Sequence, residues 1–129
     1  MGQNSTEVAY GFGQLGSAFN DGAALMKPPT NKVFVAITFL ADTTLENHGG
    51  LVAQQDSAGA GLEYISTETT AGVAQTAHDA SDGSETTSTG SGGLVVDSGN
   101  TFPKGLTIYG RWTEIHPATG GPIIAYIGD

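Results

Sequence analysis

The sequence predicts an all-β protein: a single β-sandwich or barrel of about six to eight short antiparallel strands, with an extended N-terminal arm. Twenty glycines and many serines and threonines among 129 residues disfavour helix. Short runs of β-branched and aromatic residues alternate with Gly-rich turns, as strands do. A chain of this length forms one domain and buries about two-thirds of its unfolded surface.

Residues 1–31 are predicted to form the arm, or a lightly structured lead-in with room for one short strand or one helical turn. The stretch is rich in Gly and Asn, and near its end Pro28 and Pro29 block helix and sheet ladder alike. Its apolar residues are too many for a linker, so we expect the arm to pack on a partner, such as a neighbouring subunit. The side chains expected to make this contact are Tyr10, Phe12, Leu15 and Phe19.

The β-sandwich domain is predicted over residues 32–129. Its strongest strand, Val33–Leu40, is apolar on both faces and should be central and covered from both sides. Shorter strands are expected at 51–54, 61–66 and 93–97. Residues 66–93 are almost entirely Ser, Thr, Gly, Ala and acids, which predicts a long surface excursion or an exposed edge.

Two apolar runs at 102–115 and 122–128 flank a Pro- and Gly-rich connection at 116–121, a pattern that predicts a terminal β-hairpin. Within the first run, alternation places Trp112 on one face and Tyr109 on the other. The residues expected to anchor the fold are Trp112, Tyr109, Phe34 and Ile108.

Gly110 lies between Ile108 and Trp112 on the same predicted face. A glycine inside a strand indicates either a bulge or a place where another group lies close to the backbone. We therefore expect a bulge at Gly110, or the indole of Trp112 lying across it.

Thirteen acidic residues oppose four basic ones, and no Lys or Arg occurs between Lys32 and Lys104. Such a surface repels phosphate backbones, so we expect no nucleic-acid partner; it suits a solvated exterior or a basic partner. The absence of cysteine excludes disulfides and Cys-ligated metal sites. No apolar run approaches the ~20 residues that cross a bilayer, and we expect no membrane partner.

The motifs that could carry chemistry are weak. Gly11, Gly13 and Gly16 match the dinucleotide-binding pattern, but the residues after them do not favour the helix that this site needs. The acidic loop 79–85 departs from the calcium-loop spacing, and a solvated loop is the simpler interpretation. The histidines at 48, 78 and 116 are far apart in sequence. We predict no catalytic residues, no metal ligands, no cofactor and no enzyme activity.

The run Tyr109-Gly110-Arg111-Trp112, a short turn, and the terminal run 124–128 resemble the end of small virion structural proteins of tailed phages, especially those of marine cyanobacteria. The resemblance covers 102–128 and extends more loosely to 33–43 and 92–101. It implies a protein that decorates or cements the capsid surface, assembled in the host cytoplasm. The implied partners are the major capsid protein or other virion subunits, with a homo-oligomer, and a trimer favoured.

The alternative is a tail, knob or fibre-associated β-domain, one that binds a host glycan. Glycan binding would favour aromatic side chains on the solvent face, and the suitable residues are Tyr109 and Tyr64. A small enzyme or ligand-binding sandwich is a third class, for which the sequence offers no site.

Overall fold

The computed structural model describes residues 15–54, 65–67, 96, 98–119 and 121–129, and within them the protein is all-β. Seven strands and no helix occur in this part of the chain. The strands are β1 (Ser17–Asn20), β2 (Val33–Phe39), β3 (Thr44–Leu45), β4 (Leu51–Ala53), β5 (Thr107–Ile115), β6 (Pro117–Thr119) and β7 (Ile123–Gly128). The predicted fold class is therefore confirmed.

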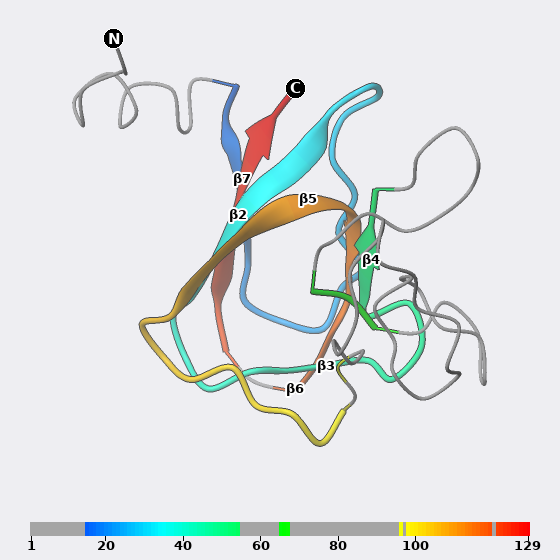
Figure 1. The fold of residues 1–129 in the computed structure, drawn as a ribbon. Helices are drawn as coiled ribbons and strands as arrows, with labels where there is room; N and C mark the ends of the chain where they lie inside the picture. Colours follow the sequence, from blue (N-terminus) through cyan, green and yellow to red (C-terminus); the bar gives the residue numbers. More distant parts are fainter. Residues whose placement is uncertain (1–14, 55–64, 68–95, 97, 120) are drawn as a thin grey trace, which may run out of the picture.

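A five-stranded antiparallel sheet has the order β1-β7-β2-β5-β4, and β3 pairs with β6 in a two-stranded sheet. Figure 1 shows β5 curving away from β2 towards β4, and the chain returning through β6 to β7. Of the two predicted architectures the barrel is not formed, because the sheets of the described residues do not close on themselves.

β2 takes the central place that its sequence predicts, between β7 and β5. Phe34, Ile37 and Phe39 are completely buried, and Ala36 on the opposite face is nearly so. The expectation that both faces of this strand are covered is met only in part, because Thr38 on the face opposite the core is half-buried.

The predicted terminal hairpin is wrong, because β5 and β7 each pair with β2 and not with each other. The segment expected to be a turn contains β6, which pairs with β3. Main-chain bonds on both sides of His116 hold this crossing: Glu46 N donates to His116 O at 2.9 Å, and His116 N donates to Gly50 O at 2.8 Å. β5 and β7 thus each pair with β2, which is apolar on both faces, and not with each other as the short connection between them suggested.

The core lies on one side of the five-stranded sheet. Trp112 and Phe34 are fully buried and Ile108 nearly so, as expected of residues that anchor the fold. The other main core residues are Met26, Ile37, Phe39, Leu45, Leu51, Phe102, Ile115 and Ile123. The rings of Phe39 and Phe102 stack with centroids 4.8 Å apart, which joins β2 to the segment before β5.

The indole of Trp112 lies against Gly110. A Cβ added to Gly110 would come within 2.6 Å of the Trp112 ring, so glycine leaves the space that the ring occupies. The indole Nε1–H donates to Ile65 O at 2.6 Å, which satisfies its only polar group. This is the second of the two arrangements expected at Gly110.

Tyr109, also expected to anchor the fold, is exposed over 66% of its surface and lies outside the core. The cause is the alternation itself: Tyr109 pairs with Ala36, whereas Ile108 pairs with Ile37 on the core side.

The described part of the expected arm joins the sheet. β1 pairs with β7 along its whole length. Met26 is buried and exchanges main-chain hydrogen bonds with Ile115 at 2.8 and 3.0 Å. Tyr10 and Phe12 lie outside the described residues.

Ser66 and Thr67, which composition assigned to the surface excursion at 66–93, are fully buried. Thr67 N donates to Leu51 O, and Leu51 N donates to Thr67 Oγ1 at 2.8 Å, so this short segment covers the edge of β4. Bonds to Leu51 of β4 satisfy the main-chain N–H and the hydroxyl of Thr67, and this is why its side chain can be buried here. Residues 68–93 lie outside the described part of the chain, as do most of the strands expected at 61–66 and 93–97.

Candidate functional site: the outer face of the sheet

Two rows of paired residues run across β1, β7, β2 and β5 on the side away from the core. The first row is Ser17, Tyr126, Ala36 and Tyr109. The second row is Phe19, Ile124, Thr38 and Thr107. Directly paired residues of antiparallel strands project to the same side of the sheet, so these side chains share one face. We call these two rows the outer face.

Aromatic side chains stand at both ends of the outer face. Phe19 on β1 is 62% exposed and Tyr109 on β5 is 66% exposed. Between Tyr126 and Tyr109 lies the small residue Ala36, which is only 1% exposed. The outer face is therefore an aromatic surface across strands distant in sequence.

The polar groups of the outer face are neutral. Thr38 Oγ1 and Thr107 Oγ1 lie 2.8 Å apart and share a hydrogen bond, and the phenol of Tyr126 lies in the neighbouring row. Neither row contains an acid or a base, although the chain carries a net charge of −9. A partner can thus approach this face without meeting the acidic surface directly.

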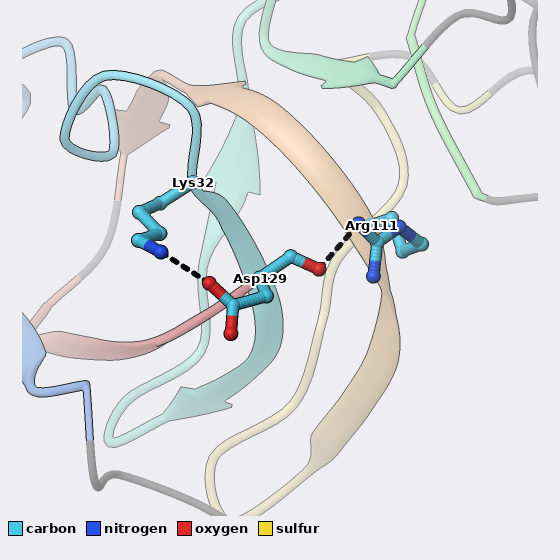
Figure 2. Close-up of polar contacts among 3 residues, drawn as sticks. All are labelled: Lys32, Arg111 and Asp129. Atoms are coloured by element: carbon cyan, nitrogen blue, oxygen red, sulfur yellow. Dashed lines mark hydrogen bonds and ion pairs between the residues drawn. The ribbon is translucent and has the colours of Figure 1, made fainter.

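A polar cluster joins Lys32, Arg111 and Asp129, as Figure 2 shows. Arg111 donates from Nη2 to the main-chain oxygen of Asp129 and from Nε to Gln54 Oε1, each at 2.7 Å. Lys32 forms an ion pair with the Asp129 carboxylate. These cations have internal partners, so their geometry indicates a structural role.

The residues expected to contact a partner are partly brought together. Phe19 lies in the outer face, and Leu15, also exposed, precedes β1. The outer face also includes Tyr126 and Ile124, which were not expected to be contact residues, and Tyr109, which was expected to contact a glycan only in the alternative function. The position of Tyr109 could be inferred from the sequence, because alternation places it on the other face of the strand from Trp112. No sequence pattern indicated that β1 would pair with β7.

No metal-binding cluster is present among the described residues. No group of three His, Cys, Asp or Glu side chains in this part of the chain is close enough to hold a metal ion. His78 and the acidic loop 79–85 lie outside it. Where the dinucleotide motif needs a helix after its glycines, residues Ser17–Asn20 form a strand instead. Across the described ranges no helix is long and apolar enough to span a membrane.

Comparisons with protein families, with curated proteins and with solved structures found no match to this chain. The sequence pattern and the outer face therefore carry the functional argument.

Proposed function

We propose that this chain is a structural virion protein that decorates or cements the capsid of a tailed phage, in contact with the major capsid protein or other virion subunits. The outer face carries the proposal, because it exposes aromatic side chains of strands that are distant in sequence. Exposed apolar clusters on a folded domain indicate interaction sites. The resemblance of residues 102–128 to phage structural proteins supports the choice of a virion.

The physical basis is burial of apolar area against neighbouring subunits. Each Å² removed from water contributes about 25 cal/mol, so a contact around Phe19 and Tyr109 is weak when made once. In a shell the same contact is repeated many times, and a subunit that bridges two neighbours gains affinity through effective concentration. The neutral outer face suits such a contact, because it limits the repulsion that a strongly acidic chain brings with it.

The first experiment is the copy number of this protein in purified virions, measured by quantitative mass spectrometry against the major shell protein. Copies in a fixed high ratio to the shell protein would support decoration. A low number would move the protein to the tail or fibres, and its absence from particles would overturn a virion role.

A binding assay then tests the outer face itself. Phe19→Ser should reduce binding to capsids that lack this protein, because it removes an exposed ring without disturbing the core. Leu25→Ser is the matched control: Leu25 is 47% exposed but lies outside the two rows. Equal loss of binding in both variants would contradict the assignment of the outer face.

The exposure of Tyr109 favours one second candidate, a tail or fibre-associated domain that binds a host glycan. Tyr109 lies two residues along β5 from Thr107, whose hydroxyl pairs with that of Thr38, so this face offers a sugar both an exposed ring and hydrogen-bonding groups. Titration with polysaccharide purified from the host surface tests this by calorimetry. Tyr109→Ala should abolish the binding heat and Leu25→Ala should leave it unchanged; no heat with the unmodified protein would exclude this candidate.

A further inference from the structure

The two edges of the five-stranded sheet differ. At the β4 edge, Thr67 N donates to Leu51 O at 2.9 Å, so a segment of the same chain covers that edge. At the other edge, β1 pairs with β7, and no second strand pairs with β1 among the described residues. An uncovered edge strand presents main-chain donors and acceptors to another chain.

The register shows which groups point outward. Ile127 N donates to Gly16 O at 3.0 Å, so Gly16 and then every second residue of β1 faces β7. Main-chain groups alternate sides along an antiparallel strand. The N–H and C=O groups of Ser17 and Phe19 therefore point away from the sheet.

β1 is short, but it carries no charge, proline or bulge of the kind that keeps sheet edges apart. Soluble proteins place lysine, proline or a bulge on edges that must stay single. The edge also carries the exposed ring of Phe19.

We propose that β1 pairs antiparallel with β1 of a second copy of this chain, about a twofold axis at Ala18. Ser17 of one copy then lies opposite Phe19 of the other, and their outward N–H and C=O groups bond reciprocally. The two sheets join into one continuous sheet across the axis, and the two outer faces become one surface.

The sequence of β1 is self-complementary in this register. Ser17 of each copy lies opposite Phe19 of the other, so a small side chain faces a large one in both pairs and the two phenyl rings do not collide. The residue on the axis is Ala18, whose methyl group leaves room for its symmetry mate. With the axis at Phe19 instead, only the pair of Phe19 residues would bond reciprocally within β1, against two Ser17–Phe19 pairs in the proposed register.

The charge distribution also favours pairing through β1 of a second copy of this chain. The chain has a net charge of −9, so contact through most of its surface is repulsive, whereas β1 is neutral. The nearest acid is Asp21, and the symmetric pairing puts the two Asp21 residues at opposite ends, about 20 Å apart at ~3.3 Å per residue. That exceeds the Debye length of roughly 8 Å at physiological salt.

Single cysteines test the register, because the chain contains no cysteine of its own. In the paired state the two Ala18 Cα atoms lie about 4.5 Å apart, within disulfide reach, so Ala18→Cys should cross-link under mild oxidation. Ser17→Cys is the matched control: its two Cα atoms lie about 8–9 Å apart by strand geometry, outside that reach. Ser17 is the more exposed of the two, so random collision would cross-link it faster.

The expected result is faster covalent dimerisation of Ala18→Cys than of Ser17→Cys, with unchanged circular dichroism for both. In parallel, sedimentation velocity of the unmodified protein should show the mass rising from one chain to two with concentration. Ser17→Pro should remove that rise, because it deletes an outward donor. A mass of one chain at every concentration, a trimer, or equal cross-linking of both cysteines would overturn the proposal.

Discussion

Gly110 and Trp112 form a contact in which the missing side chain of one residue makes room for the other. A Cβ at position 110 would lie 2.6 Å from Trp112 Cζ2 and 2.9 Å from Cη2, distances that real structures do not tolerate. The ring cannot move aside easily, because its Nε1–H is bonded to Ile65 O and it is completely buried.

Gly110→Ala should therefore lower the free energy of unfolding by about 1–3 kcal/mol, the range typical of overpacking. Urea denaturation followed by the fluorescence of the single tryptophan measures it. Gly22→Ala is the control, since the nearest atom to its added Cβ is Asn20 Oδ1 at 3.9 Å. Equal stability of the two variants would show that the indole is not held against Gly110.

Ser66 and Thr67 are adjacent and fully buried, and their hydroxyl groups differ in whether they form hydrogen bonds. Thr67 Oγ1 accepts from Leu51 N at 2.8 Å, whereas Ser66 Oγ has no partner among the described residues. Thr67→Val should cost about 1–3 kcal/mol by leaving Leu51 N unpaired, and Ser66→Ala should be neutral or stabilising. Thermal unfolding of the two variants gives the comparison; a destabilised Ser66→Ala would reveal a partner for that hydroxyl.

At the scale of elements, the strand at β2 could be predicted and its neighbours could not. The apolar residues on both faces of Val33–Phe39 predict a central strand, and this pattern can be recognised within the segment itself. The choice of β5 and β7 as its partners depends on which pairing buries most area over the whole chain. The hairpin prediction failed because a short connection at 116–121 also accommodates β6.

The candidate site follows the same division. The alternation of Tyr109 against Trp112 could be read from the sequence, and it places Tyr109 on the solvent side. The position of Phe19 beside Ile124 could not, because it follows from the pairing of β1 with a strand more than a hundred residues later. The buried Thr67 was missed because composition does not reveal a partner such as Leu51 N.

The hydrogen bonds of Arg111, which link β5 to the residue after β7, can be tested by substitution. Arg111→Met should lower the free energy of unfolding by about 1 kcal/mol, because Gln54 Oε1 and the main-chain oxygen of Asp129 lose their donor. Asp129→Asn should have a smaller effect, since its ion pair with Lys32 is largely exposed. Lys104→Met, the loss of an exposed base, is the control. A greater loss of stability in Asp129→Asn than in Arg111→Met, measured by chemical denaturation, would contradict this structural role of Arg111.

At the scale of the whole molecule, charge opposes folding. Thirteen acids against four bases give self-repulsion that is greater in the compact state, and salt screens it. The midpoint temperature of unfolding should therefore rise between roughly 10 and 150 mM NaCl and then level off, as screening does. Scanning calorimetry at several salt concentrations measures it. A midpoint that falls with salt would show that the ion pairs of Lys27 and Lys32 outweigh the repulsion.

The place of β2 between β5 and β7 has a consequence for synthesis. β2 leaves the ribosome early, but Ile37 pairs with Ile108 and Ala125, which are made near the end of the chain. Until then the most apolar strand has no sheet to join, and such non-local pairing folds slowly. The apolar side chains of β2 therefore wait for their native partners until the last residues are made, and fragments that stop before β7 cannot complete the central pairing.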